Sequence, residues 1–309
     1  MTGTALGHEA LLYRSDERFV AALTPFLTEG LRHGDATVAV VTPHHLELLR
    51  RSLGDDATRV RFIDRDAWYD RPVATIARWI DLVGAALAGG HRSIRVVGEV
   101  AFRPEARIDS WIRYESAVND VFAGVPARIL CPYDTRRLPD RVIAGVLRTH
   151  PVVDAGRRGP SDRYERPEHL LRDLPEPLPP VTRAPLVAMS LTGPHGPRHV
   201  RRAIEAMAHA LGWDRTTIGK LSLVVTEIAV NSLTHGRGDR RIRVWIDDGS
   251  ITCEVADDGD GPGDPLAGYR PPADPQSHGM GLWLANRLSD WLAIDHGDGT
   301  TRVRFRLTP

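Results

Sequence analysis

The sequence predicts an α/β protein of two domains, on three observations. In the first half, short β-rich runs alternate with amphipathic segments, which is typical of a mostly parallel sheet with helices on both faces. Seven of residues 155–185 are proline, and such a segment separates domains. After it, helical patterns come first and a mainly antiparallel run of strands follows. A length of 309 residues is enough for two separate cores.

Residues 1–154 form the first predicted domain. Its β-rich runs predict strands at 9–13, 37–42, 59–63, 93–98 and 127–131. Its amphipathic segments predict helices at 17–32, 44–52, 73–88, 108–122 and 140–148. In the helix at 108–122, apolar residues recur close to a period of 3.6, which gives it one face to bury against a sheet.

Residues 155–184 are predicted to be a linker between the domains. The proline cluster at 175–180 favours extended polyproline geometry, and we expect neither a helix nor a central strand in this segment. A linker of this composition is a semi-rigid spacer.

Residues 185–309 form the second predicted domain. The pattern predicts strands at 185–191, 241–247, 252–256, 291–296 and 301–307, and helices at 197–211, 216–233 and 282–288. Asp-Gly pairs at 248–249 and 298–299 predict tight hairpin turns. A loop rich in glycine, proline and aspartate separates the third strand from the last helix.

Composition excludes several function classes. Lys+Arg and Asp+Glu are both 40, so the net charge of zero argues against attraction of the whole chain to nucleic acid or an anionic membrane. Two distant cysteines suit a reducing compartment, and no apolar run approaches the roughly 18–20 residues that span a bilayer. We therefore expect a cytoplasmic protein. The single lysine, Lys220, lacks the glycine pattern of a P-loop, which excludes that nucleotide site and the eukaryotic protein-kinase fold.

The helix predicted at 216–233 and the residues after it carry the strongest chemical pattern. Glu227, Asn231 and His235 recur at i, i+4 and i+8, so they share one helical face. An Asn oxygen is a suitable ligand for Mg²⁺, and a Glu can act as a general base. A solvated polar face that ends in a His-Gly cap fits these residues equally well when they are considered alone.

Two glycine-rich segments follow. Asp257 ends a predicted strand and precedes Gly259 and Gly261, so its carboxylate can accept a hydrogen bond from an adenine amino group while the glycines let the backbone approach. An ordinary Asp/Gly surface turn is the alternative. The second segment, Gly279-Met280-Gly281-Leu282, opens a helix, and backbone N–H groups at such a terminus favour an anion.

Together these three segments resemble, over residues 185–309, the Bergerat ATP-binding fold that gyrase, MutL and histidine kinases share. The resemblance implies an α/β sandwich with a mixed sheet, and ATP bound with Mg²⁺. Glu227, Asn231 and His235 match the N box, and the glycine segments match the two glycine boxes. Thr300 or Thr301 resembles the threonine that supports the adenine-binding Asp, and the sequence does not choose between them.

The compact size and the Glu-x-x-x-Asn-x-x-x-His pattern resemble the small anti-sigma-factor serine kinases. This resemblance implies that Glu227 is the catalytic base, that Asn231 holds Mg²⁺, and that a serine of a STAS-type anti-anti-sigma protein is phosphorylated to control a sigma factor. It leaves a homodimer open. A nucleotide-binding module that sequesters a partner without phosphotransfer, and an atypical histidine kinase, are the alternatives.

The first half resembles the MEDS sensory domain, a RecA-like module. The resemblance rests on His8-Glu-Ala-Leu-Leu-Tyr13, Val97-Gly-Glu99, Glu115-x-x-x-Asn119, Cys131-Pro-Tyr-Asp134 and His150-Pro151. Glu99, Cys131, Tyr133 and Asp134 follow or end predicted strands, and ligands bind open α/β sheets at the carboxyl ends of strands. We expect these four side chains to line a sensory pocket.

Overall fold

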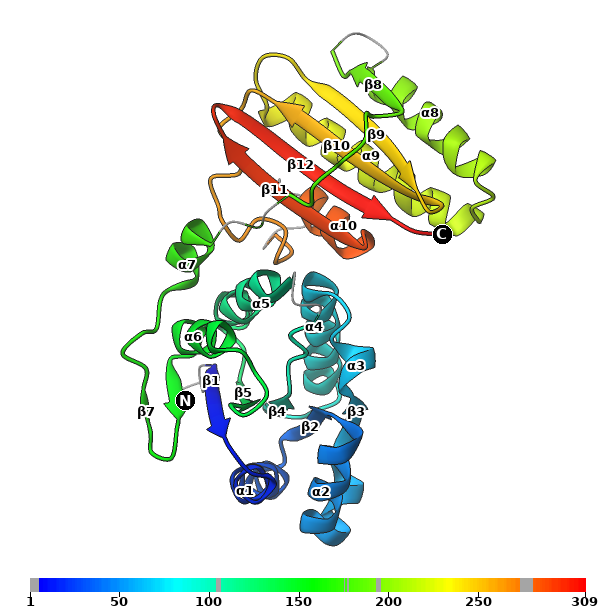
Figure 1. Cartoon of the computed structure of the whole chain (residues 1–309). Helices are drawn as coiled ribbons and strands as arrows, with labels where there is room; N and C mark the ends of the chain where they lie inside the picture. The colour runs from blue at the N-terminus through cyan, green and yellow to red at the C-terminus, as the bar shows by residue number, and fades with distance from the viewer. Residues whose placement is uncertain (1–5, 104–106, 175, 177, 193–195, 273–279) are drawn as a thin grey trace. The chain divides into compact units, whose positions relative to one another are not determined.

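The structure, a computed structural model, describes residues 6–103, 107–174, 176, 178–192, 196–272 and 280–309 (Figure 1). The chain divides into two compact units, Met1–Leu174 and Pro175–Pro309. Each unit has a sheet of its own, with seven strands in the first and five in the second. The predicted α/β fold class is therefore confirmed.

The sheet of the first unit is mostly parallel, in the order β3-β2-β4-β5-β1-β6-β7. Only the pairing of β6 with β7 is antiparallel among its described strand pairs. The strands are β1 (Gly7–Tyr13), β2 (Ala36–Val41), β3 (Arg61–Asp64), β4 (Ile94–Gly98), β5 (Ala127–Asp134), β6 (Val152–Asp154) and β7 (Arg158–Pro160).

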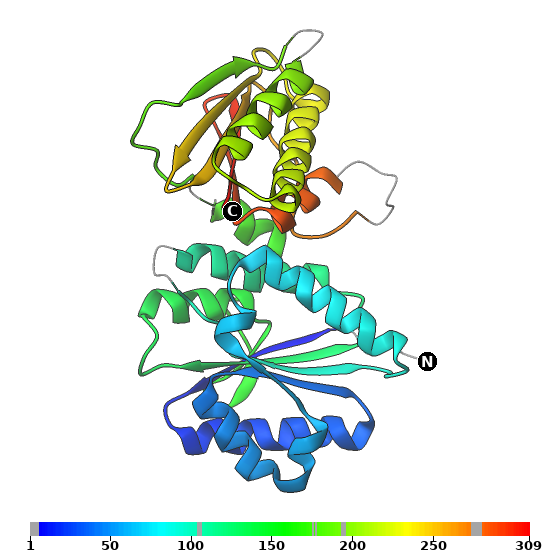
Figure 2. The same cartoon turned by 90° about the vertical axis from the view of Figure 1, so that its right-hand side faces the viewer.

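Helices cover both faces of this sheet. The α-helices are α1 (Asp16–His33), α2 (Pro43–Leu53), α3 (Arg65–Trp68), α4 (Pro72–Ala88), α5 (Ile108–Val121), α6 (Asp140–Thr149) and α7 (Pro167–Asp173), and a 3-10 turn follows α2 at Gly54–Arg59. Figure 2 shows α1 and α2 on one face, and α4, α5 and α6 on the other.

Helix α1 illustrates how the sequence sets these elements. Ser15 caps its first turn by accepting a hydrogen bond from the backbone N–H of Arg18, and Gly34 ends it in the left-handed conformation. Phe19, Leu23 and Leu27 recur at i, i+4 and i+8 and are fully buried. This stripe packs on the sheet together with α2, which builds the core of that face.

The segment predicted as a linker is not extended throughout. Its first part folds onto the first unit as the edge strand β7 and the seven-residue helix α7. The proline content was expected to exclude a helix here, and α7 departs from that expectation. Pro167 occupies the first helical turn, where its missing N–H is not needed. Leu170 and Leu171 are buried, and the buried Arg113 donates to the carbonyl oxygens of Leu171 and Leu174. Burial and capping therefore outweigh the proline content here.

The second unit is a five-stranded sheet with helices on one face. The elements are β8 (Val187–Ser190), α8 (Gly196–Ala210), α9 (Arg215–His235), β9 (Arg241–Asp247), β10 (Ser250–Asp257), α10 (Met280–Leu288), β11 (Trp291–Gly297) and β12 (Thr300–Leu307). The sheet order is β11-β12-β10-β9-β8. Its described strand pairs are all antiparallel, as the sequence pattern mainly predicted, whereas the resemblance implied a mixed sheet.

Two Asp-Gly turns set the register of this sheet. Asp248 and Gly249 both have positive φ, as do Asp298 and Gly299, which is the backbone of a two-residue type I′ hairpin. The first turn joins β9 to β10 and the second joins β11 to β12, as predicted. The apolar faces of α8 and α9 then close the core over β9, β10 and β12.

The second part of the predicted linker lies along the sheet of the second unit. The Trp245 indole N–H donates to the Arg183 carbonyl over 3.0 Å, and the Leu186 N–H donates to the Val244 carbonyl over 2.8 Å. The segment before β8 is thus held on β9. Within the residues that the structure describes, none of the helices is both long and apolar enough to cross a membrane.

Candidate nucleotide-binding site

Helix α9 carries the three polar residues predicted to share a face. Asp214 caps the helix by accepting hydrogen bonds from the N–H groups of Thr216 and Thr217, and the helix ends at His235 before Gly236. Its apolar side is buried in the core. Glu227 and Asn231 are half-buried, while His235 is exposed.

Asp257 ends β10 and lies beside the end of α9. Only 8% of its surface is exposed. Its carboxylate accepts a hydrogen bond from the Ser232 hydroxyl at 2.8 Å and one from the Gly259 N–H at 2.9 Å. A Cβ at Gly236 would lie 2.5 Å from Cγ of Asp257, so the helix end can approach the carboxylate only because residue 236 is glycine. Both partners of Asp257 are neutral, which leaves its charge available to a ligand.

Ser232 is a site residue that sequence reasoning missed. It is buried and follows Asn231 directly, on the side of α9 that faces β10. The only feature of the sequence that could have indicated its role is its position four residues before Gly236, the glycine that ends the helix. Its hydroxyl fixes one oxygen of Asp257, which sets the direction of the carboxylate.

The threonine beside Asp257 is Thr301. The two residues are directly opposed in the antiparallel pair of β10 and β12. The buried Thr301 hydroxyl donates to the Gly259 carbonyl at 2.8 Å, and it lies 3.2 Å from Nδ1 of His296. Thr300 is paired with Gly297 at the hairpin end. Gly261 needs its glycine because its φ is +72° and a Cβ there would lie 3.2 Å from the His296 side chain.

Helix α10 meets the polar face of α9 at Gly281. A Cβ at this position would lie 2.6 Å from Oε2 of Glu227 and 3.1 Å from Nδ2 of Asn231. The two helices can therefore come this close only with glycine at 281. Met280 begins the helix and is half-buried, and Leu282 follows. Gly279 lies outside the described residues.

A cavity of about 280 Å³ joins these elements. Its polar lining includes Asn231, Ser232, His235, Asp257 and Thr301, together with the glycines at 236, 259, 261 and 263. Its apolar lining consists of Ile228, Val255, Leu282, Ile294, Val303 and Pro262. A flat ring could pack between such apolar side chains while Asp257 accepts a hydrogen bond from it.

The structure separates the four residues predicted to line a sensory pocket. Glu99 and Asp134 both line a crevice of about 550 Å³ in the first unit. Cys131 and Tyr133 are not among its lining residues, because successive side chains of β5 point to opposite faces of the sheet. They lie instead with His8, Glu115 and His150. The prediction of one shared pocket is therefore wrong for Cys131 and Tyr133.

Glu99 is held at the crevice by three neighbours. Nδ1 of His45 lies 2.8 Å from Oε2, the Thr42 N–H donates to the same oxygen, and Arg65 donates to Oε1 at 3.2 Å. Burial raises the pKa of Glu99, but His45, the Thr42 N–H and the charge of Arg65 outweigh it and leave the pKa below its ordinary value. Asp134 is paired with Arg136, whose hydrogen bonds lower the pKa of Asp134.

Cys131 and His150 lie in a different environment. Burial, with the charge of Glu115, raises the pKa of the Cys131 thiol well above its ordinary value. Burial, with the proximity of His8, lowers the pKa of His150. Both shifts favour the neutral side chain.

Comparison with known proteins matches two different family models, one to a region in each of the two units of the chain. Residues 7–151 match the family model of the MEthanogen/methylotroph, DcmR Sensory domain (MEDS), and residues 194–307 match that of the histidine kinase-like ATPase domain. No curated protein matches the chain. Among solved structures, similarity is found to the RsbU and RsbW domains of Rv1364c from Mycobacterium tuberculosis, at 21% identity and a TM-score of 0.30, covering 41% of this chain. The match spans 33% of the length of that chain. The chain thus combines a MEDS domain with a histidine kinase-like ATPase domain, which implies ATP binding.

Proposed function

We propose that this chain is an ATP-dependent anti-sigma regulatory protein. In this proposal it phosphorylates a serine of a STAS-type anti-anti-sigma partner and thereby controls a sigma factor, and its N-terminal domain gates that activity. The observation that carries the proposal is the convergence of Glu227 and Asn231 on Gly281, beside a cavity that contains Asp257. A carboxylate is thus placed next to a carboxamide that borders a cavity of about 280 Å³.

The adenine base of ATP fits the cavity end that holds Asp257. The base would lie between Val255, Ile294 and other apolar side chains, and its amino group would donate to the carboxylate. Gly259 and Gly261 would let the backbone approach the nucleotide. The phosphates would then extend toward the start of α10, where backbone N–H groups and the helix dipole favour negative charge.

Asn231 fits the requirements of a Mg²⁺ ligand. Its carboxamide borders the cavity and makes no hydrogen bond to another described residue, so its oxygen is available to a hard cation. When bound, Mg²⁺ would neutralise charge on the phosphates. His235, at the cavity edge on the same side of α9, would contact the nucleotide.

Glu227 is positioned to act on the attacking group. It lies one helical turn before Asn231 and does not line the base cavity. We infer that it accepts the proton of the serine hydroxyl while the serine oxygen forms a bond to the γ-phosphorus. The bond from that phosphorus to the bridging oxygen breaks, and ADP leaves with the electron pair. The products are ADP, phosphoserine and protonated Glu227.

The zero net charge supports protein partners rather than direct contact with nucleic acid or a membrane surface. We propose a cytoplasmic site of action, which the two distant cysteines support. A sigma factor and a STAS-type protein would bind the ATPase domain in turn, and the protein could act as a homodimer.

Glu227→Gln tests the chemistry separately from binding. We expect ATP affinity and partner binding to be retained while transfer falls by about 10²–10⁴, which is the usual contribution of a positioned base. The measurement is single-turnover phosphorylation of STAS-type proteins from the same genome, with nucleotide binding measured by calorimetry. Glu205→Gln is the matched control, because Glu205 lies on α8 and contacts Ser222 away from the cavity.

Asn231→Ala completes this test. We expect it to lose Mg²⁺-dependent ATP binding and all transfer. Transfer by Glu227→Gln at the rate of the natural chain would contradict the kinase mechanism and favour nucleotide-gated sequestration. An acid-labile phosphate on this chain itself would instead indicate a histidine kinase, because phosphoserine is stable in acid.

A further inference from the structure

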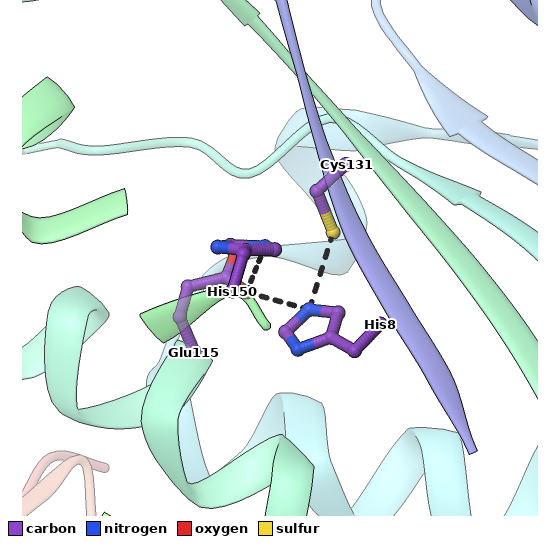
Figure 3. A group of neighbouring side chains, drawn as sticks. All are labelled: His8, Glu115, Cys131 and His150. Atoms are coloured by element: carbon purple, nitrogen blue, oxygen red, sulfur yellow. Dashed lines mark hydrogen bonds and ion pairs between the residues drawn. The ribbon is translucent and has the colours of Figure 1, made fainter. Parts of the chain in front are cut away.

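Four buried side chains from separate parts of the first unit meet at one point (Figure 3). His8 lies on β1, Glu115 on α5, Cys131 on β5, and His150 directly after α6. None is more than 3% exposed. One ligand atom from each lies within 4.8 Å of those of the other three. This cluster has no part in the proposed phosphotransfer.

Three of the six distances between the ligand atoms are close to those between ligands of one tetrahedral ion, and the other three are at most 4.8 Å. Nε2 of His8 lies 3.2 Å from Oε2 of Glu115 and 3.6 Å from Sγ of Cys131, and Nε2 of His150 lies 3.5 Å from the same Glu115 oxygen. Ligand atoms that sit at zinc bonding distances around a tetrahedral centre are separated by about 3.3–3.6 Å. A cavity of about 20 Å³ borders His8, Glu115 and Cys131.

The hydrogen bonds of His8 direct its Nε2 lone pair into the cluster. The Asn119 side-chain N–H group donates to the carbonyl oxygens of Glu115 and Thr149, so its Oδ1 is an acceptor. Nδ1 of His8, 3.0 Å from that oxygen, must therefore carry the hydrogen. In the neutral ring, Nε2 then presents a lone pair to Glu115 and Cys131.

His150 is oriented in the same way. Its Nδ1 lies 3.0 Å from the Val146 carbonyl oxygen, which can only accept, so Nδ1 is the donor. Its Nε2 lone pair then faces Glu115. Tyr133 donates to Oε1 of Glu115 at 3.0 Å, which leaves Oε2 directed at both imidazoles. Two nitrogen lone pairs and a carboxylate oxygen repel one another unless a proton or a metal cation lies among them, and the Tyr133 hydroxyl also lies 3.3 Å from Nε2 of His150.

We propose that His8, Glu115, Cys131 and His150 form a buried tetrahedral site for a divalent metal ion of the Zn²⁺ class. Two imidazoles, a thiolate and a carboxylate are the donor types that Zn²⁺ prefers. The charges of the thiolate, carboxylate and ion sum to zero, which suits a buried site. Asn119, Val146 and Tyr133 supply the outer hydrogen bonds that orient the ligands of such sites.

A second group of metal-binding residue types does not have this geometry. Asp16, His44 and His45 also lie close together, at the crevice of the first unit. Nε2 of His44 is 2.7 Å from the Asp16 carboxylate, which is a hydrogen-bond length and too short for two ligands of one ion. The exposed His44 thus provides a control position.

Cobalt(II) binding to the whole protein tests the proposal through its two cysteines. Both are buried, but Cys253 lies in the core of the second unit, and among the described residues it belongs to no group of side chains that could hold a metal ion. The protein is stripped with a chelator, and Co²⁺ and then Zn²⁺ are titrated. We expect Cys253→Ser and His44→Gln to bind one Co²⁺ per chain with a thiolate-to-cobalt charge-transfer absorption, which Zn²⁺ abolishes by displacement. Cys131→Ser should lose this absorption and at least about 100-fold in metal affinity.

The outcomes are decisive even if Cys131→Ser fails to fold. Cys253→Ser retains Cys131 as its one thiol, so a charge-transfer absorption in that variant assigns the ligand without the other variant. Absence of metal binding by Cys253→Ser would overturn the proposal and leave the cluster joined by shared protons. Binding without the absorption would show that Cys131 is not a ligand, and binding that Cys131→Ser retains but His44→Gln loses would place the metal at the crevice; either result would overturn the proposal.

Discussion

Strand β10 carries two buried acids, and their surroundings differ in kind. Glu254 lies on one face of the sheet and is bound by two arginines, Arg304 and Arg243, the latter at 3.1 Å. Asp257, three residues on, lies on the other face, toward the helices, and is bound by a hydroxyl and a backbone N–H. Both are less than 10% exposed. Burial therefore does not distinguish them, but the charge of their partners does.

The difference shows how a ligand-binding acid can be separated from a structural one. The two guanidinium groups offset the charge of Glu254, and it lines neither the cavity of about 280 Å³ nor the one of about 740 Å³ in the second unit. Asp257 has only neutral hydrogen-bond partners, so no cation offsets its carboxylate, and it faces the cavity. A buried carboxylate without a cationic partner is stable only if its remaining lone pairs are satisfied, and a donor on a bound nucleotide would satisfy them.

Glu254→Gln should have the largest effect on stability and none on nucleotide affinity. Loss of the carboxylate leaves Arg304, which is largely buried, without its anion. We expect a loss of about 3 kcal/mol in the free energy of unfolding, the lower end for breaking a buried ion pair. Urea denaturation measures the loss, and ATP titration of the folded variant should match the natural chain. A weakened ATP affinity would mean that both faces of β10 serve the site.

Asp257→Asn should have the opposite effects: ATP affinity should fall, while the fold is retained. The amide oxygen can still accept from the Gly259 N–H, and the amide N–H group can donate to the Ser232 hydroxyl, so the fold is tolerated. It would, however, present a donor to the adenine amino group. Loss of a charge-assisted hydrogen bond of about 1.5–3 kcal/mol should weaken ATP affinity about ten- to hundredfold. Calorimetry on the folded variant checks this, and an unchanged affinity would remove Asp257 from the adenine site.

Glu99 in the first unit combines features of both acids, since it has cationic partners and also lines a crevice. Its pKa is below the ordinary value of 4.5 in the folded state. Its contribution to stability is therefore complete above that pH and is lost as the pH falls through the folded-state pKa. Glu99→Gln should cost about 1.5–2 kcal/mol at pH 7. Urea denaturation should show this gap narrowing below pH 4.5, and a gap that widens in acid would contradict the sign of the shift.

The sequence was sufficient to predict those features of the fold and site that depend on residues close together in the chain. The Asp-Gly pairs predicted two hairpins because both residues can adopt positive φ, and the i, i+4 spacing predicted the shared face of Glu227 and Asn231. The alternation of strands and helices predicted the parallel sheet of the first unit. These are short-range properties of the chain, and tertiary contacts did not change them.

The sequence was insufficient to predict features that depend on side-chain packing or on strand pairing. Helix α7 forms in a proline-rich segment because its leucines are buried and Arg113 binds its last carbonyls. Cys131 and Tyr133 were placed in the wrong pocket because the sequence does not show which face of β5 each side chain occupies. Only the exact strand register shows that. Ser232 was missed because its role depends on how close α9 lies to β10. Such contacts join residues that are distant in the chain.

Substitution of Thr301 has the smallest predicted effect on ATP affinity, and the neighbouring Thr300 provides a direct comparison. The sequence offered both as the threonine that supports Asp257. Thr301 is buried, opposes Asp257 across the strand pair, and donates to the Gly259 carbonyl, whereas Thr300 lies at the hairpin end. Thr301→Val keeps the shape and removes one neutral hydrogen bond of about 0.5–1.5 kcal/mol, so ATP affinity should fall about two- to twelvefold.

Thr300→Val is the matched control for this prediction. It makes the same chemical change one residue earlier in β12, where the side chain does not line the cavity. We expect ATP affinity within about twofold of the natural chain and comparable thermal stability, because a surface substitution outside such contacts changes stability by at most about 0.5 kcal/mol. Calorimetric titration of both variants under one condition decides between them. A larger loss in Thr300→Val than in Thr301→Val would mean that the nucleotide reaches the hairpin end, and that the hydrogen bond from Thr301 to Gly259 only stabilises the fold.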